Sequence, residues 1–337
     1  MNSDLILLGH GSGGRLSHQL LDELIIPALS SVGQSEQNDA ALLRFAGGKL
    51  AYTTDSYVVQ PVFFPGGNIG DLAVNGTVND LAMMGAKPLW LSVGLILEEG
   101  FSKKELVEIL ASMRVAADIA GVQIVTGDTK VVPRGKADRI FINTSGIGVV
   151  EHDLEINGAN AHVGDSIIVS GTIGDNGIAV MASREGLELE CTIESDSAAL
   201  NALVLELVAA LGTGLHVLRD PTRGGVATTL KEIAVQSTVD LMLREDALPM
   251  KAAVKGVCSI LGLDPLYVAN EGKMLLFVAP EAVEAAMALL QSHPLGVDAA
   301  IIGTVTAKGT GKVALETVSG GVRGVEMLSG EQLPRIC

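Results

Sequence analysis

The N-terminal part of the chain combines a glycine-rich loop with a helical pattern of apolar residues. The loop is GHGSGG, at residues 9–14. Apolar side chains then recur on one face at helical spacing, at Leu16, Leu20, Leu21, Leu24 and Ile25. We therefore expect residues 1–40 to form a Gly-rich loop and a helix that precede the first domain.

Strand and helix patterns alternate over residues 41–155. Helix 102–121 is amphipathic, with Ser102 as N-cap and Gly121 as C-cap. Such alternation predicts an α/β layer. The expected strands cover residues 49–59, 90–97, 122–132 and 139–150, and a second helix covers 70–85.

A second α/β unit is predicted over residues 156–318. Its expected elements are a strand, turn and helix over 164–181, helices at about 196–211 and 224–236, a strand and helix over 271–290, and strands at about 300–306 and 312–318. Glycines at 320, 321 and 324 then predict a flexible tail over residues 319–337. The chain is thus expected to be a two-domain α/β (α+β) protein.

Composition excludes several classes of function. The net charge of −16 and an aromatic content of 3% argue against nucleic-acid binding, which needs basic side chains and stacking platforms. No apolar run approaches the ~18 residues of a membrane span, and the N-terminus does not resemble a signal peptide. Three cysteines, at 191, 258 and 337, do not suggest a disulfide framework, so we expect a reducing cytoplasm.

Four aspartates indicate a site for metal and phosphate. Asp39, Asp55 and Asp128 stand at turns or strand ends, whereas Asp80 lies inside a helical stretch beside Asn75 and Asn79. Carboxylates near an apolar helix face need a partner, and Mg²⁺ with a substrate phosphate would provide one. The alternative is that each aspartate caps a helix or turn, which explains Asp80 least well.

Gly-rich turns and two charged residues extend this hypothesis. The turns that contain Gly13 and Gly14, Gly174 and Gly177, and Gly224 and Gly225 precede helices, whose N-termini bind anions. None matches the two standard nucleotide fingerprints, and plain turns would explain each equally well. Lys130 is a candidate phosphate contact or a surface lysine, and Glu271 offers a carboxylate at a turn that could equally be a surface turn.

Taken together and in order, these segments resemble the aminoimidazole-ribonucleotide-synthetase-like ATP-binding superfamily. The motifs are HGSGG, NDAAL, TTDSYVV, NGTVNDLAMMGAKP, GDTKVV, SGTIGDNG, DPTRGGVA and NEGK, and they cover nearly the whole chain. The ending PRIC, at residues 334–337, is similar to that of the hydrogenase-maturation members. One departure is GDNG at 174–177, where the family more often has GDHG, so we assign Asn176 no catalytic role.

The resemblance implies a fold, partners and a reaction. Each domain would be a mixed sheet with helices, residues 41–155 would bind ATP and form a homodimer, and 156–318 would be the C-terminal α/β domain. The carbamoyltransferase HypF would carbamoylate the sulfur of Cys337. With ATP and Mg²⁺, the chain would dehydrate this group to a thiocyanate, and the cyanide would reach the iron of a [NiFe] hydrogenase through the HypC–HypD complex.

The resemblance also implies roles for particular residues. Cys337 would be a carrier on an arm of about 19 residues, which spans up to ~60 Å when extended. Glu271 would be the base and Lys130 a phosphate contact. Metal and phosphate would be held by Asp39, Asp55, Asp80 and Asp128, with Asn75, Asn79, Gly13 and Gly14 also near the nucleotide.

Two alternatives remain at this point. A sister enzyme of the superfamily would share the acidic residues. A selenophosphate synthetase would be expected to carry a reactive cysteine near its N-terminal Gly-rich stretch, whereas the first cysteine here is Cys191, and an aminoimidazole ribonucleotide synthetase has no reason to end in PRIC. A maturation scaffold with a docking tail would explain Cys337 but leave the acidic residues without a function.

Overall fold

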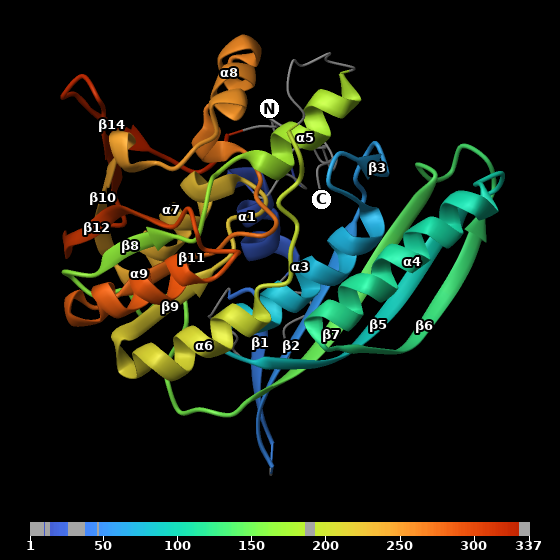
Figure 1. The fold of residues 1–337 in the computed structure, drawn as a ribbon, viewed down its shortest axis with the longest axis horizontal. Helices are drawn as coiled ribbons and strands as arrows, with labels where there is room; N and C mark the ends of the chain where they lie inside the picture. Colours follow the sequence, from blue (N-terminus) through green and yellow to red (C-terminus); the bar gives the residue numbers. More distant parts are fainter. Residues whose placement is uncertain (1–9, 11–13, 26–37, 46, 186–192, 330–337) are drawn as a thin grey trace.

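Two sheets, each with its own helices, form the molecule (Figure 1). The computed structural model describes residues 10, 14–25, 38–45, 47–185 and 193–329. Within these ranges no helix is both long enough and apolar enough to cross a membrane. The predicted two-domain α/β class is confirmed.

The N-terminal sheet has five strands in the order β1-β2-β7-β5-β6. Strands β5 and β6 are parallel and the other neighbours antiparallel, so the sheet is mixed. Side chains of β7 alternate between buried and partly exposed, which shows that one face is covered. The strands are β1 (Ala41–Phe45), β2 (Gly48–Tyr57), β5 (Lys87–Glu98), β6 (Gln123–Val132) and β7 (Ile140–Val150).

Helices α3 (Ile69–Met83) and α4 (Lys103–Ala120) cover that face. A capping box starts α3: the Asn68 side chain accepts a hydrogen bond from the backbone N–H of Gly70, and Asp71 accepts one from that of Asn68. Gly121 ends α4 in the left-handed conformation, at φ 71°. Helix α3 is buried almost throughout because it also packs against one helix of the second sheet, Asn201–Leu211.

The C-terminal sheet has seven strands in the order β14-β13-β10-β12-β8-β11-β9. It is also mixed, since β10 and β13 are parallel. Its strands are β8 (Ser166–Val169), β9 (Leu215–Arg219), β10 (Val239–Arg244), β11 (Leu275–Val278), β12 (Ala300–Lys308), β13 (Val313–Glu316) and β14 (Val322–Val325). Its helices are α5 (Asp175–Arg184), α6 (Asn201–Leu211), α7 (Gly225–Ser237), α8 (Ala252–Leu261) and α9 (Val283–Ser292).

Short elements complete the fold. Near the N-terminus, α1 (Arg15–Leu20) continues into the π-helix η2 (Leu21–Ile25), which agrees with the predicted helix. Strands β3 (Phe63–Phe64) and β4 (Gly67–Asn68) form a small hairpin, and single 3-10 turns occupy η3 (Gly212–Gly214), η4 (Glu245–Ala247), η5 (Pro265–Tyr267) and η6 (Pro280–Ala282).

The structure differs from the predicted elements in three ways. The helix expected from about 196 begins at Asn201, because the preceding serines and Asp196 make polar contacts in an irregular segment instead. Some elements were not predicted, namely β1, β9, β10 and α8, although the side chains of β10 alternate between buried and partly exposed. Part of the expected flexible tail, Val322–Val325, pairs with β13 as β14.

Among the described residues, no helix covers the second face of the N-terminal sheet, which we call the uncovered sheet face. Its exposed apolar side chains include Tyr52 at 42%, Trp90 at 47% and Ile96 at 41% exposure. Apolar patches on one sheet face mark interaction surfaces in many proteins.

Candidate active site

Four carboxylates meet where the two sheets approach each other. Asp55 lies near the end of β2 and Asp80 near the end of α3, while Asp220 follows β9 and Glu271 precedes β11. Each contributes to the electrostatic environment of one or more of the others. The fold therefore concentrates negative charge from both domains in one place.

Asp80 is fixed from the N-terminal domain. The Thr53 hydroxyl donates to its Oδ2 at 2.7 Å. Burial raises the pKa of Asp80 well above the usual value, and the nearby Asp220 and Asp55 raise it further. A carboxyl group buried among other carboxylates favours the binding of a cation, because the cation neutralises their charge.

Glu271 is the most enclosed of the predicted catalytic residues. It is 2% exposed, which contradicts the alternative that it lies on a surface turn. Its Oε1 has no hydrogen-bond partner among the residues that the structure describes. Burial, and then Asp220 and Asp55, raise the pKa of Glu271 well above the usual value, while Arg223 lowers it. An ionised Glu271 would therefore be a stronger base than an exposed glutamate.

Neighbouring backbone contacts hold Glu271 in place. Its carbonyl oxygen accepts a hydrogen bond from Asn79 Nδ2 at 3.0 Å. The adjacent Asn270 receives a bond from the backbone N–H of Gly174 at 2.7 Å and donates to the carbonyl of Pro221. The turns that precede α5 and α7 are thus tied to the segment that carries Glu271.

Asn75 and Asn79 do share a helix face, as predicted, but the structure gives them contacts within the protein. Asn79 bonds to the carbonyls of Ala198 and Glu271 and accepts from the backbone N–H of Leu200. Asn75 donates to Ser197 Oγ at 3.0 Å. These bonds hold the irregular segment before α6 against α3.

Asp39 belongs to a separate chain of charges at the edge of the cluster. Its Oδ1 lies 2.7 Å from Arg219 Nε, and Arg219 also contacts Glu232, which contacts His18 of α1. Burial raises the pKa of Asp39 to about 6, although Arg219 lowers it. Asp39 is therefore held at the edge of the site by its ion pair with Arg219 of the C-terminal domain.

Asp128 and Lys130 do not join this cluster within one chain. They lie on the edge strand β6 and contact each other at 2.5 Å, with side chains 70% and 68% exposed. Strand pairing runs from Ser56 through Asn143 and Gly94 to Asp128, which is three strand spacings of ~4.8 Å, or about 14 Å.

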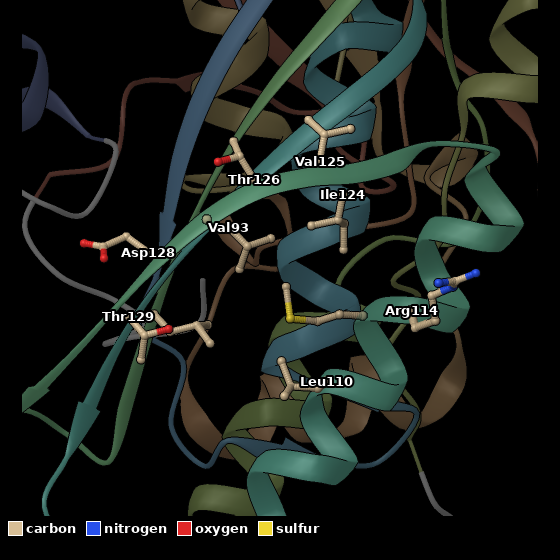
Figure 2. Close-up of a pocket in the computed structure, with 11 residues that line it drawn as sticks. Val93, Leu110, Arg114, Ile124, Val125, Thr126, Asp128 and Thr129 are labelled. Carbon is tan, nitrogen blue, oxygen red and sulfur yellow. The ribbon is translucent and has the colours of Figure 1, made fainter.

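A cavity of about 590 Å³ lies between β6 and α4, beside Asp128. Val93, Leu110 and Asp128 all line it, but the Asp128 carboxylate points away from the other two side chains (Figure 2).

Two predicted residues lie outside the described part of the chain, namely Gly13 and Cys337. Gly14 is described and precedes α1, where a Cβ would lie 2.3 Å from the carbonyl oxygen of Leu328. Gly14 is thus required by a close backbone approach.

The four predicted aspartates do not form a ready-made metal site. Among the described residues, no three His, Cys, Asp or Glu side chains form a group that could hold a metal ion. The site does contain buried carboxylate oxygens without a hydrogen-bond partner in the described chain, at Asp39 Oδ2 and Asp220 Oδ2. Such oxygens suit a hard divalent cation.

Asp220, Arg219 and Arg223 were missed by sequence reasoning. Arg223 Nη2 lies 3.5 Å from Asp55 Oδ1 and so faces the cluster. The signal was present in the motif DPTRGG, where a carboxylate follows an apolar strand and precedes a Gly-rich turn. Asp55 stands at a similar strand end.

Comparison with known proteins identifies the family. Residues 37–150 match "AIR synthase related protein, N-terminal domain" and residues 162–316 match the corresponding C-terminal domain. The chain is 53% identical over 330 residues to carbamoyl dehydratase HypE of Bradyrhizobium diazoefficiens, covering 98% of this chain and 95% of that relative.

Solved structures agree. A HypE–HypF complex has a TM-score of 0.86 at 47% identity, covering 92% of this chain and 99% of that one. HypE in complex with ATP has a TM-score of 0.83 at 50% identity, covering 99% and 100%. The chain belongs to the AIR synthase related family and, within it, to the HypE carbamoyl dehydratases of hydrogenase maturation.

Proposed function

We propose that this chain uses ATP to dehydrate an S-carbamoyl group on Cys337 to a thiocyanate, which supplies the cyanide ligand of [NiFe]-hydrogenase iron. The observation that carries the proposal is Glu271, a buried carboxylate with an unpartnered oxygen, set among Asp55, Asp80 and Asp220. Support also comes from the HypE relatives and from the ATP-bound HypE structure.

The reaction needs a leaving group and a base. The carbamoyl oxygen attacks the γ-phosphorus of ATP, ADP leaves, and an N–H proton is lost, which gives S–C(O-phosphate)=NH. Glu271 then takes the remaining N–H proton as the C–O bond breaks, so that the C≡N bond forms and phosphate departs. Exclusion of water around Glu271 protects the intermediate from hydrolysis.

The acidic cluster fits magnesium and nucleotide phosphates. Asp55, Asp80 and Asp220 would hold Mg²⁺, with Asp39 at the edge. When bound, the cation would screen phosphate charge during phosphoryl transfer. Arg223 and the turns before α5 and α7 would contact phosphate oxygens, because helix N-termini offer N–H donors. Neutralising the cluster would also favour the ionised form of Glu271.

A homodimer would bring in the remaining predicted residues. The uncovered sheet face carries exposed Tyr52, Trp90 and Ile96, and Asp128 and Lys130 lie beside it. We propose that two chains pack these faces together, so that Asp128 and Lys130 of one chain reach the nucleotide of the other. Asp128 and Lys130, which are distant from the acidic cluster of their own chain, would then act at the cluster of the other chain.

Cys337 is a better carrier than the described Cys258. Cys258 is 2% exposed, and burial raises the pKa of its thiol to about 11. A thiolate is the reactive form of cysteine, so Cys258 is a poor nucleophile. HypF would supply the carbamoyl group, as the HypE–HypF complex suggests, and HypC–HypD would receive the cyanide in the cytoplasm.

Intact mass spectrometry tests the proposal. The protein is incubated with HypF, carbamoyl phosphate and an ATP analogue whose γ-phosphate cannot be transferred, to load the carbamoyl group, and is then re-isolated and held with or without ATP and Mg²⁺. A carbamoyl adduct that loses one water only with ATP, and that Cys337→Ala does not acquire, is expected. A chain that never gains the adduct would contradict the proposal and favour a sister activity, and absence of nucleotide binding would favour a scaffold.

A further inference from the structure

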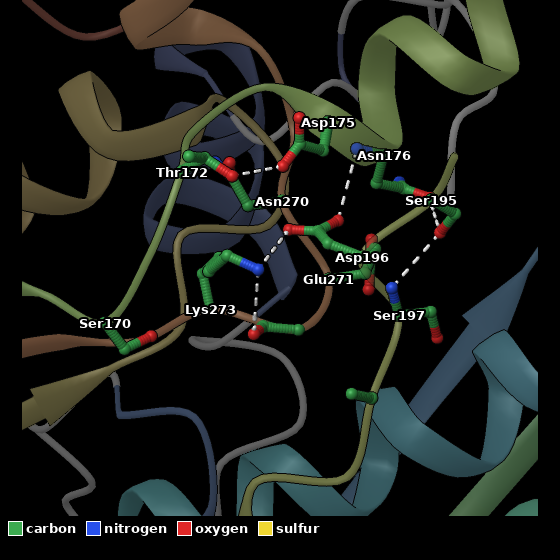
Figure 3. A network of polar contacts seen from close by, with 12 residues as sticks. Ser170, Thr172, Asp175, Asn176, Ser195, Asp196, Ser197, Asn270, Glu271 and Lys273 are labelled. Carbon is green, nitrogen blue, oxygen red and sulfur yellow. Dashed lines mark hydrogen bonds and ion pairs between the residues drawn. The ribbon is translucent and has the colours of Figure 1, made fainter. Parts of the chain in front are cut away.

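A polar cavity of about 310 Å³ is lined in part by Lys273, two residues after Glu271. It is bounded by the turn that starts α5, the irregular segment before α6, and the residues that lead into β11 (Figure 3). Asp196 lines this cavity and also raises the pKa of Glu271, so the cavity adjoins the proposed base.

Buried, hydrogen-bonded side chains build the walls of this cavity. Asp175 is 1% exposed and accepts a hydrogen bond from the Thr172 hydroxyl. Asp196 accepts from the backbone N–H of Asn176 at 3.1 Å, and Asn176 accepts from the Ser195 hydroxyl. The walls are therefore held in one conformation before any ligand binds.

The charges of the cavity do not balance. Lys273 lies 3.2 Å from Asp196 and Lys251 lies 3.1 Å from Asp175, so each lysine pairs with one buried carboxylate. Asp175 Oδ1 has no hydrogen-bond partner within the described chain. Two further carboxylates, Glu194 and Asp298, line the cavity without a lysine of their own among its lining residues. A cationic side chain is the occupant that this excess of negative charge favours.

The chain itself supplies a cation at a suitable distance from its reactive thiol. Arg335 is two residues before Cys337, which is about 7 Å in an extended chain. Both lie outside the described residues. An arginine bound in a cavity next to Glu271 would therefore leave Cys337 within reach of that carboxylate.

The starting point of this segment is fixed beside α7. Leu328 is 6% exposed, its N–H donates to Thr228 Oγ1, and its carbonyl accepts from the N–H of Arg15. Glu326 is held by Lys231 at 2.9 Å. The expected arm of 19 residues is therefore reduced to the residues after 328.

A series of contacts links this anchor to the turn that starts α5. Thr228 bonds back to Gly224 at the start of α7, and Gly225 packs against the backbone around Val268, next to the Asn270 that binds Gly174. Arg335 lies seven residues after Leu328, so the chain between them spans up to about 24 Å.

We propose that the cavity lined by Asp175 and Asp196 binds the guanidinium of Arg335 and so positions the carbamoylated Cys337 at Glu271. Arg335 is a positioning residue, and Asp175 its principal partner. This inference rests on the function proposed above.

Single-turnover dehydration tests the pairing. Arg335→Gln, Asp175→Asn and the double variant are carbamoylated, and loss of water after addition of ATP and Mg²⁺ is followed by intact mass. Each single variant is expected to slow this step about 10- to 100-fold, since each removes a charge-assisted contact. The double variant should be no slower than either single one, because both remove the same contact. Arg335→Lys should recover part of the rate.

Controls separate this inference from the proposed function. Arg323→Gln removes an arginine of β14 that forms an ion pair with Asp264, and this variant should dehydrate at an unchanged rate. If Arg335→Gln is not carbamoylated by HypF, cyanate can carbamoylate the thiol directly. Multiplicative effects in the double variant, or a normal rate for Arg335→Gln, would overturn the pairing. Failure of the unmodified chain to lose water would instead overturn the proposed function.

Discussion

The two regions that carry the predicted ATP-site residues differ sharply in their surroundings. Asp80 and Glu271 are enclosed between the domains, where burial and like charge raise their pKa values. Asp128 is exposed on β6, where the contact with Lys130 lowers its pKa. Buried carboxylates without cations destabilise a fold, so the first group indicates a ligand by itself. The second group acquires a role only when something covers its sheet face.

Loss of the base should have the largest effect. We expect Glu271→Gln to be carbamoylated normally but to dehydrate about 10²- to 10⁴-fold more slowly, because a positioned base contributes this much. Single-turnover mass spectrometry measures the rate, and ATP affinity serves as the control, since it should change little. A rate within a few-fold of the unmodified chain would remove Glu271 from the mechanism.

A variant in one region should complement a variant in the other region when the two chains pair in a dimer. Asp220→Asn and Asp128→Asn are each expected to lower ATP-dependent dehydration about 100-fold, as loss of a phosphate or metal contact does. If Asp128 acts on the other chain, co-expression of the two variants restores one complete site in each mixed dimer. Random pairing then returns about a quarter of the normal activity. No recovery in the mixture would show that both residues act within one chain.

A substitution that disrupts the uncovered sheet face should weaken dimerisation. Trp90→Arg places a charge among apolar side chains and is expected to weaken dimerisation at least 10-fold. Light scattering over a concentration series measures the change. Ile260→Arg, at a position 77% exposed on α8, is the matched control and should leave the assembly unaltered.

The smallest effect concerns stability at the edge of the buried cluster. Asp39 has a pKa of about 6 in the folded protein and ionises near 3.8 when unfolded. Between about pH 4 and pH 6 the folded state holds more protons, so this group lowers the free energy of unfolding as pH rises. Asp39→Asn should therefore flatten the decrease in Tm over that interval. A steeper decrease in the variant would contradict the raised pKa.

Periodicity predicted most of the first domain but little of the site's assembly. Helices α3 and α4 were found because apolar spacing and caps such as Ser102 are local signals. Strand β14 was missed because its glycine-rich neighbours suggested a tail, whereas pairing with β13 is a long-range contact. Local patterns do not record which strands become neighbours.

The site shows the same limit. Sequence motifs selected Asp55, Asp80 and Glu271, which the fold brings together, but also Asp128, which it does not within one chain. Asp220 was overlooked although the motif DPTRGG contains it, because its burial beside Asp39 and Asp55 arises only in the folded chain. Burial and charge proximity depend on the tertiary structure, so no spacing rule could have supplied them.

The most direct test of the account follows the oxygen atom. Cys337 is loaded with a carbamoyl group whose oxygen is ¹⁸O, and the products of ATP-dependent dehydration are analysed by mass. Phosphorylation of that oxygen, followed by loss of phosphate, predicts that the label appears in inorganic phosphate while the protein retains a thiocyanate. Label released into water, with unlabelled phosphate, would contradict the proposed chemistry.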